Sequence, residues 1–594
     1  MSVFRKLGSY SRFVGKLNGI LKLMKGLDSE STILIPDEIE NTVDRFPDKT
    51  AFIFEGRHLS FAAFEQLANR VANWGLEQDL KQGDAIALVM ENCPEYPAIW
   101  YGLSKIGVQA ALVNSNLEGF GLIHCINIVS SKAVISHGQQ AERVAAILSD
   151  LDGAPSLWDC DAVHGESFKS VLESGNADRP DPSHRTGQIG SSNCVFIYTS
   201  GTTGLPKAAK VTHSRLRRTI RMSTGLAGAT QDDIVYNVLP LYHITGGGLG
   251  LGATLFTGAT SVIRRRFSAS EFWDDVVEHK ATMFCYIGEL CRYLVNSNTH
   301  PKERSHALKT GFGNGLRGDV WSEFVDRFNV PKMCELYGST EGNVSFLNFD
   351  GKVGAVGQAP RFLDSLLGAA FVKFDFETEM PVRDKNGFCI KCGVDEVGEV
   401  IGRIVDNGRE SFEGYQDEAA TEKKILRDVF KSGDEWFRTG DLLRRDALGY
   451  IYFVDRVGDT FRWKGENVAT NEVADAMSKI PGIAMANVYG VEVPGSDGRA
   501  GMASVTETEA IDFKALGESL RAVLPAYAVP LFVKVQSEVD TTGTFKFRKV
   551  EAVKQGFQLG VSDDPIWFLS PETKVYEPLT QQNYDRIINR DYRF

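Results

Sequence analysis

The stretch from Ile197 to Lys210, IYTSGTTGLPKAAK, concentrates residue types that bind phosphate groups. Glycines allow several backbone N–H groups to point at one anion, hydroxyls add donors, and a lysine adds positive charge. A plain surface turn, the alternative, needs only one or two such residues. The stretch therefore predicts a phosphate-binding loop made by Thr199, Ser200, Gly201, Thr202, Thr203, Gly204 and Lys207.

This loop is not the nucleotide-triphosphate loop G-x-x-x-x-G-K-[ST], because Lys207 does not follow a glycine. A second glycine pattern, GNGLRG at 313–318, fits G-x-G-x-x-G, and Glu335 follows about 20 residues later, as in a dinucleotide site. It lies outside the first βαβ unit of the chain, so alone it is weak evidence for such a site.

The elements that position these residues alternate between strands and helices. DAIALVM, AVISH and CVFIYTS are typical of buried strands, whereas FAAFEQLANRVANWGL and SEFVDRFN are typical of helices. The alternation predicts an α/β fold with parallel-rich sheets layered with helices. The strand-like YIYFV is followed by the flexible DRVGD, so a hinge is predicted near Gly458, between a large domain at 28–457 and a small α+β domain at 458–594.

Composition excludes some classes of function. The chain has 594 residues and a net charge of −12, so nucleic acid is not expected as a partner. Nine cysteines without a recognisable signal peptide favour a reducing, cytoplasmic compartment. The pair in CIKC lacks a second pair at zinc-like spacing, so a strand is favoured over a metal site.

Residues 1–27 form a basic amphipathic segment with no acidic residue. Apolar residues recur on one helical face at Phe4, Leu7, Tyr10, Val14, Leu17, Leu21 and Met24. Such a helix suits contact with an anionic membrane surface, which is the interpretation favoured here. A mitochondrial targeting sequence and a helix packed on its own domain are the two alternatives.

Residues 234–263 carry no charged side chain and are long enough to span a bilayer. Six glycines between 246 and 258, with Pro240 and His243 near the start, argue against a membrane helix. We expect a buried segment whose glycines let a ligand approach the backbone.

The complete motif set resembles the adenylate-forming superfamily, which includes acyl-CoA synthetases. YTSGTTGLPKAAKVTH is followed in order by PLYH, GNGLRG, YGSTEGN, FRTGD, DRVGDTFRWKGEN and TGTFKFRK. GDTFRWKGENVATNEV, TGTFKFRKV and YEPLTQQNYDRI are similar to the fatty acid transport protein and very-long-chain acyl-CoA synthetase group.

The resemblance implies a reaction in two halves. A carboxylate attacks the α-phosphate of ATP to give an acyl-adenylate and pyrophosphate, and the thiol of coenzyme A then displaces AMP. It implies that Glu341 binds Mg²⁺ and that Thr340 contacts the α-phosphate. The implied nucleotide contacts are an adenine loop at Gly313, Asn314 and Gly315, a stacking ring at Tyr337 with Gly338 and Ser339, and ribose or phosphate contacts at Asp441 and Arg456.

The resemblance also implies that Lys546 is the catalytic lysine. Since the usual glycine does not directly precede Lys546, Lys549 remains the alternative register. A rotation of the small domain would then present Arg462, Lys464, Gly465, Glu466 and Asn467 for thioester formation. Tyr242 and His243 would stand at the entrance of the acyl pocket.

The predicted function is ATP-dependent activation of long- or very-long-chain fatty acids to acyl-CoA. This activation could also be coupled to fatty acid uptake, because it traps the acid as its thioester. One alternative is an acyl-AMP ligase that loads a carrier protein. Another is a fatty acid binding or transport protein without turnover, although such a protein has no chemical need for Lys546, Glu341 and Asp441.

Overall fold

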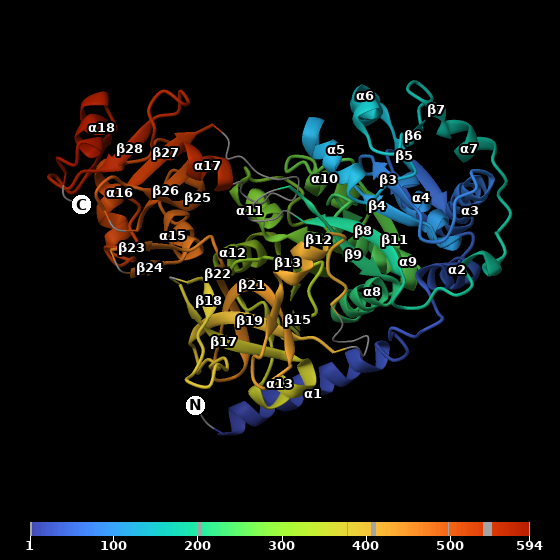
Figure 1. Ribbon diagram of the computed structural model, residues 1–594, viewed down its shortest axis with the longest axis horizontal. Coiled ribbons are helices and arrows are strands. Elements are labelled where there is room, and N and C mark those ends of the chain that lie inside the picture. Colours follow the sequence, from blue (N-terminus) through green and yellow to red (C-terminus); the bar gives the residue numbers. More distant parts are fainter. Residues whose placement is uncertain are drawn as a thin grey trace.

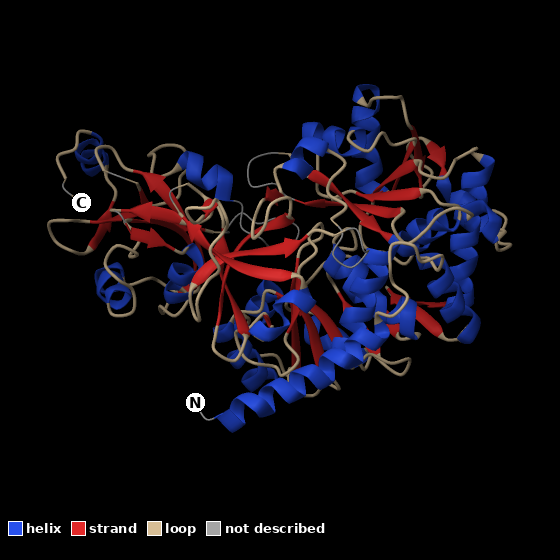
Figure 2. Ribbon diagram, turned by 60° about the horizontal axis from the view of Figure 1, so that its bottom comes forward, coloured by secondary structure: helices blue, strands red, loops and turns tan. Residues whose placement is uncertain are grey.

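The computed structural model describes residues 3–199, 205–376, 378–405, 412–464, 466–496, 498–537, 549–592 and 594. Two parallel-rich sheets, an antiparallel sheet and a separate carboxyl-terminal sheet organise the chain (Figure 1). The α/β fold class predicted from the sequence is confirmed. The small carboxyl-terminal domain stands to one side of the larger body in both views (Figures 1 and 2).

The first sheet has the order β7-β6-β5-β3-β4-β8-β9 and is parallel except at β8–β9. Its strands are β3 (Ala85–Val89), β4 (Gln109–Leu112), β5 (Ala133–Ser136), β6 (Ser156–Asp159), β7 (Glu166–Ser167), β8 (Asn193–Thr199) and β9 (Lys207–Thr212). Every residue of β3 is buried, as expected for a strand covered by helices on both faces.

The second sheet has the order β15-β14-β13-β12-β10-β11-β1-β2 and is parallel from β14 to β1. Its strands are β1 (Thr50–Phe54), β2 (Arg57–Ser60), β10 (Ile234–Asn237), β11 (Thr260–Ile263), β12 (Met283–Ile287), β13 (Thr310–Asn314), β14 (Lys332–Gly338) and β15 (Ser345–Leu347).

Helices of the large domain cover these sheets (Figure 2). Side chains of β1, of β3 and of helices between them share one hydrophobic core, so this helical layer is buried between the two sheets. The helices are α1 (Val3–Leu23), α2 (Ile35–Arg45), α3 (Phe61–Glu77), α4 (Glu95–Lys105), α5 (Gly119–Asn127), α6 (Gly138–Ile147), α7 (Phe168–Ser174), α8 (His213–Ala227), α9 (Leu251–Thr257), α10 (Phe272–Glu278), α11 (Gly288–Asn296), α12 (Gly318–Phe328), α13 (Asp364–Leu367) and α14 (Glu418–Glu422).

The third sheet is antiparallel, in the order β16-β22-β21-β19-β17-β18, with β20 paired to β21. Its strands are β16 (Gly357–Gln358), β17 (Ala369–Asp375), β18 (Met380–Pro381), β19 (Val397–Arg403), β20 (Ile425–Arg427), β21 (Glu435–Arg445) and β22 (Tyr450–Arg456).

The small domain follows β22. It contains the hairpin β23 (Phe461–Trp463) and β24 (Glu466–Val468), and the sheet β25 (Ile483–Glu492), β26 (Arg499–Glu507), β27 (Phe532–Gln536), β28 (Ile566–Leu569) and β29 (Tyr576–Pro578). Its helices are α15 (Thr470–Met477), α16 (Phe513–Arg521), α17 (Lys549–Gln555) and α18 (Gln581–Ile588).

Helix α1 lies along the lower edge of the molecule in Figure 1 and packs on the large domain. Phe13, Leu17 and Ile20 are each less than a tenth exposed. The Phe13 ring meets that of Phe349 edge-on at 5.5 Å, and the Lys16 ammonium lies 3.2 Å from an Asp350 carboxylate oxygen. From Tyr10 onward much of the apolar face is therefore turned into the protein, as the alternative of a helix packed on its own domain expects, and contact with a membrane surface stays a prediction.

Among the helices that the structure describes, none combines the length and apolar character needed to cross a bilayer. The uncharged stretch 234–263 is divided between β10, a π-helical turn at Ile244–Gly250, α9 and β11.

Candidate active site

Both parallel sheets direct strand ends toward one cavity of about 1000 Å³. Thr199 ends β8, Asn314 ends β13 and Gly338 ends β14, and all three line this cavity. Ligands of open α/β sheets bind beyond the carboxyl ends of the strands, so this is the expected position for a site. The third sheet adds Asp441 and Arg456 to the same wall.

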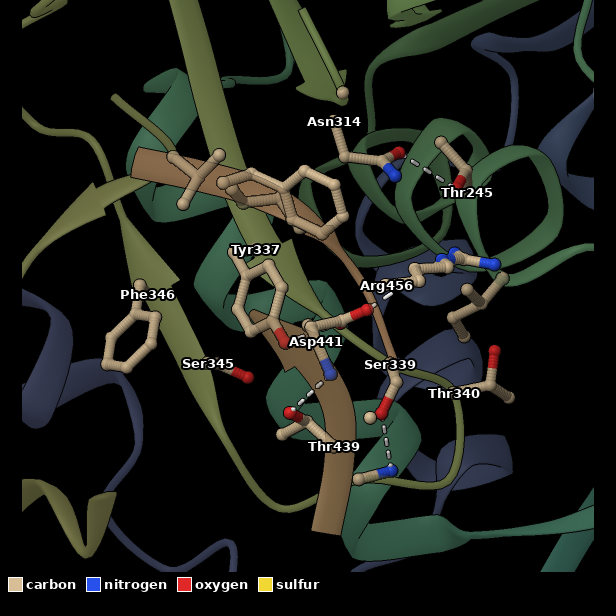
Figure 3. A pocket seen from close by; sticks show the side chains of 18 of the residues that line it. Thr245, Asn314, Tyr337, Ser339, Thr340, Ser345, Phe346, Thr439, Asp441 and Arg456 are labelled. Carbon is tan, nitrogen blue, oxygen red and sulfur yellow. Dashed lines mark hydrogen bonds and ion pairs between the residues drawn. The ribbon is translucent and has the colours of Figure 1, made fainter. Parts of the chain in front are cut away.

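Tyr337, Asp441 and Arg456 form a connected group on this wall (Figure 3). The Tyr337 hydroxyl donates to Asp441 Oδ2 at 2.6 Å, and Arg456 Nε lies 3.7 Å from Asp441 Oδ1. Burial, and next the Asp441 carboxylate, raise the pKa of the Tyr337 hydroxyl, so this hydroxyl remains a donor. The Tyr337 ring is stacked with Phe346 at a centroid distance of 5.7 Å.

The loop after β13 is fixed from two sides. The Thr245 hydroxyl lies 3.2 Å from Asn314 Oδ1, and Gly315 adopts a φ of +81°, which favours glycine. Glu335 Oε1 accepts from the backbone N–H groups of Gly315 and Leu316. Glu335 therefore holds this loop from beneath, rather than binding a ribose as in a dinucleotide site.

Lys207 and Glu341 both lie beside Tyr415. The Lys207 ammonium lies 5.4 Å from the centroid of the Tyr415 ring, and the Tyr415 hydroxyl donates to Glu341 Oε1 at 2.8 Å. Burial, and next the Glu341 carboxylate, raise the pKa of Tyr415. The end of the predicted phosphate loop and the predicted magnesium ligand thus share one support.

Arg215 of α8 supports the segment that carries Thr340. Its Nε donates to the Thr340 carbonyl at 2.8 Å, and its guanidinium pairs with Glu413 at 2.6 Å. Thr212 caps α8, since its hydroxyl accepts from the Arg215 backbone N–H. Ser339 Oγ accepts from the Gly342 N–H at 3.0 Å, which closes the turn around Thr340 (Figure 3).

The segment 414–416 joins the first sheet to the site. Lys210 N donates to Gly414 O at 3.1 Å, Gln416 N donates to Ala208 O at 2.9 Å, and Ala209 and Tyr415 form an antiparallel bridge. Strand β9 therefore gains a further partner from a part of the chain that follows it by some two hundred residues. This pairing fixes the Tyr415 ring beside Lys207.

The cavity brings together most of the described residues that the motifs single out. Those lining it are Thr199, Lys207, Tyr242, His243, Asn314, Gly315, Tyr337, Gly338, Ser339, Thr340, Glu341, Asp441 and Arg456. Gly313 is not among them, because it passes the backbone of β12 so closely that a Cβ would lie 1.9 Å from the Tyr286 carbonyl oxygen. Predicted site residues outside the described part of the chain are Ser200, Gly201, Thr202, Thr203, Gly204, Gly465 and Lys546.

The small domain carries two groups of predicted site residues, the lysines at 546 and 549 and the thioester residues at 462–467. Lys549 lines the cavity, with its ammonium 3.1 Å from Asp459 Oδ2 and 2.8 Å from Thr470 Oγ1. The β23–β24 hairpin carries the predicted thioester residues, and those described there do not line the cavity: Arg462, Lys464, Glu466 and Asn467.

Tyr242 and His243 lie side by side in the wall, with ring centroids 4.5 Å apart. The glycines that follow have a different role from the one predicted. A Cβ on Gly246 would lie 2.3 Å from the Pro240 oxygen, and one on Gly247 would lie 2.1 Å from the Leu241 oxygen. These glycines admit the protein's own backbone rather than a ligand, and the segment faces the cavity through Ile244, Thr245 and Leu249.

Sequence reasoning missed the supporting residues Arg215, Glu413, Tyr415 and Thr439, and it noted Glu335 only as part of a dinucleotide pattern. The Thr439 hydroxyl accepts from the Asp441 backbone N–H at 3.1 Å, as Figure 3 shows. Thr439 lies within the FRTGD motif, which is a signal that could have revealed it. Tyr415 carries no such signal, because the residues it joins lie far from it in the sequence.

Comparison with known proteins identifies the family. The model of the family described as "AMP-binding enzyme" matches residues 39–415. The mouse "Long-chain fatty acid transport protein 6" is 41% identical over 94% of this chain and 92% of its own length. The rat "Long-chain fatty acid transport protein 2" is 41% identical over 92% of this chain and 89% of its own.

Solved structures share the fold at low sequence identity. The anthranilate CoA ligase AuaEII in complex with anthranoyl-AMP superposes with a TM-score of 0.74, at 19% identity over 87% of this chain and 96% of that one. The Mycobacterium tuberculosis fatty acyl CoA synthetase superposes with a TM-score of 0.62, at 22% identity over 88% and 98%. The chain belongs to the AMP-binding enzymes, within the group of the long-chain fatty acid transport proteins.

Proposed function

We propose that this protein activates long- or very-long-chain fatty acids to acyl-CoA, using ATP and passing through an acyl-adenylate. The observation that carries the proposal is the continuity of one cavity, which runs from Thr340 and Asp441 to the apolar side chains of Met222, Leu249 and Phe349. A nucleotide and an alkyl chain therefore fit into the same space. The names of the relatives, which refer to long-chain fatty acids, support the same choice of acid.

In the first half-reaction two anions must meet, so donors and positive charge have to be in place beforehand. We assign the β- and γ-phosphates to the loop between Thr199 and Lys207, and the α-phosphate to Thr340. Asp441, already oriented by Tyr337, is assigned to the ribose hydroxyls because a carboxylate forms strong, directed bonds with hydroxyl donors.

Glu341 fits the requirements of a Mg²⁺ ligand. Its carboxylate lines the cavity and is 8% exposed, and Tyr415 fixes one of its oxygens. Mg²⁺ prefers oxygen ligands and takes few from the protein when phosphates supply the others. When bound, the ion would neutralise phosphate charge, while Tyr415 and Arg215 keep the protein side of the site in position.

For the second half-reaction we propose that the small domain turns about Gly458. The φ of Gly458 is +88°, and a Cβ there would meet no atom within 4 Å, so the position is strained for other residues but not crowded. The rotation would bring the β23–β24 hairpin to the site, with Lys464, Glu466 and Asn467 facing coenzyme A.

The state of the cysteines supports a reducing compartment. All nine are free thiols, and eight of them are buried. In an oxidising compartment paired cysteines are usual. We therefore propose that the enzyme works where cytoplasmic ATP and coenzyme A are available.

The test is AMP release by the purified protein with ATP, Mg²⁺ and a series of fatty acids, with and without coenzyme A. Release that requires both the acid and coenzyme A would support the proposal. Adenylate formed without coenzyme A-dependent AMP release would favour a ligase that loads a carrier protein. Tight fatty acid binding without turnover would overturn the enzymatic assignment.

A further inference from the structure

We propose that helix α1 forms the far wall of the acyl compartment and thereby limits the length of the acid. The inference rests on the proposed function, because it assigns a surface to the methyl end of the fatty acid. It gives the amino-terminal segment a role in substrate selection.

The first observation is the composition of the cavity wall. Four side chains of α1, together with Met24 directly after its last residue, line the same cavity as Thr340 and Asp441. The four are Phe13, Leu17, Ile20 and Leu21. Apart from the adjacent pair Ile20 and Leu21, they recur at three- and four-residue steps. From Phe13 to Met24 they extend for about 16 Å along the direction of the helix, and so form one apolar stripe. A stripe of this length suits an alkyl chain rather than a polar ligand.

The second observation is the change of character along α8. Its cavity-facing residues are, in order, Arg215, Arg218, Thr219 and Met222. Arg215 contacts the Thr340 carbonyl, and Met222, the apolar one, lies about 10 Å further along the helix. Met222 packs against the same apolar cluster as Met24, which follows α1, and Phe349. The compartment is therefore polar at the nucleotide and apolar at α1, in the order that an acid with its carboxylate at Thr340 requires.

The third observation is that α1 is held close to α8. A Cβ on Gly225 would lie 2.7 Å from Leu23 Cδ1 and 2.8 Å from Ile20 Cδ1, so only glycine allows this approach without a shift. Lys16 Nζ also donates to the Phe349 carbonyl at 2.7 Å. A wall fixed in this way has a defined position, and so it can discriminate between acids of different length.

Bulky substitutions on α1 and at Met24 test the proposal. Leu21→Trp and Met24→Trp fill the end of the compartment, and Leu21→Ala enlarges it. Asn18→Trp is the matched control, because it adds the same ring to an exposed position of the same helix. The measurement is kcat/KM for coenzyme A-dependent AMP release across saturated acids of increasing length.

We expect the two lining Trp variants to lose tenfold or more with the longest acids accepted by the unmodified enzyme, and less than twofold with the shortest. Leu21→Ala should move the optimum to longer acids, and Asn18→Trp should leave the profile unchanged. Activity with short acids serves as the folding control. A profile unchanged in the lining variants, or an equal loss at every length, would overturn the role of α1.

A labelling experiment gives a readout independent of turnover. A long fatty acid with a photoreactive diazirine at its methyl end is bound to the full-length protein and irradiated, and the labelled peptide is identified by mass spectrometry. Label on residues 13–24 is expected. Label confined to the other end of the cavity, at Asn114 and Leu117, would overturn the inference even if the enzyme is active. Absence of AMP release with every acid, by contrast, would count against the proposed function itself.

Discussion

Two buried hydroxyls orient the carboxylates of the site. Tyr337 donates to Asp441, and Tyr415 donates to Glu341. In both cases burial raises the pKa of the phenol, so the tyrosine hydroxyl stays a donor. Each carboxylate thus has a fixed direction before any ligand arrives, which reduces the entropy lost on binding.

Tyr337→Phe should therefore raise the KM for ATP about tenfold, because a hydrogen bond to a charged group is worth roughly 1.5–3 kcal/mol and part of it is replaced by water. The change in kcat should be smaller. Initial rates of AMP release at varied ATP concentration measure both. If the KM does not change, Asp441 needs no support from Tyr337.

Glu335 gives a pH dependence of stability. Burial raises the pKa of this carboxyl to about 8, while its ordinary value is 4.5. The native state therefore binds a proton that the unfolded state has released between these values, so this group's contribution to stability falls as pH rises from about 4.5 to about 8. In the protonated form Oε2 can donate to Tyr286, whose hydroxyl also contacts the Cys334 carbonyl.

Glu335→Gln should remove that slope, because an amide keeps the acceptor for the Gly315 N–H and supplies a permanent donor to Tyr286. Relative to the unmodified protein, the variant should gain roughly 1–4 kcal/mol of unfolding free energy as pH rises through this window. Parallel melting curves at several pH values test this. Glu335→Leu, which loses both interactions, should be less stable at every pH. If the unfolding free energies of the Gln variant and the unmodified protein differ by the same amount at every pH, the assignment is contradicted.

For amphipathic and glycine-rich elements, the sequence predicts the element but not the group that packs against it. Strands such as β3 and β8 and helices such as α3 and α12 can be predicted from the sequence. The pattern of apolar residues that indicates each of them lies within the segment itself. The periodicity of residues 1–27 predicted a helix, but it could not tell a membrane from α8 as the partner of its apolar face. The glycines after Pro240 were likewise predicted to allow close approach. The prediction named a ligand as the approaching group, whereas at Gly246 and Gly247 the structure shows backbone oxygens of the chain itself.

The glycine at 247 provides a direct test of that correction. Gly247→Ala places a methyl group 2.1 Å from the Leu241 oxygen, so we expect a loss of about 1–3 kcal/mol and faster thermal inactivation. Gly19→Ala on α1 is the control, since no atom lies within 4 Å of its Cβ, and there the helix should gain up to about 1 kcal/mol. Equal behaviour of the two variants would show that the contact at Leu241 relaxes without cost.

The small domain contributes to the cavity with part of its predicted residues. Lys549 lines the cavity, whereas the described residues of the β23–β24 hairpin do not. Lys549 already contacts Asp459 and Thr470, which is consistent with a supporting role. Lys546 lies outside the described residues, so its assignment as the catalytic lysine stays a prediction, as does the domain boundary near Gly458.

Substitutions in the small domain should separate the two half-reactions. Lys546→Ala should abolish adenylate formation and leave a supplied acyl-adenylate able to react with coenzyme A. Lys464→Ala should do the opposite, with adenylate formed at the usual rate and thioester formation slowed about tenfold or more. Single-turnover assays of each half-reaction measure these effects. A loss of adenylation in Lys549→Ala that exceeds the loss in Lys546→Ala would reverse the two lysine assignments.

The pairing of β9 with the segment 414–416 also governs the order in which the enzyme is assembled. Strand β9 can join β8 as soon as residue 212 is available, but Tyr415 reaches Lys207 only after some two hundred further residues have been synthesised. We therefore expect a nascent chain to complete the pairing of β8 with β9 before Tyr415 lies beside Lys207. A chain that ends before residue 415 lacks the side chain that contacts both Lys207 and Glu341.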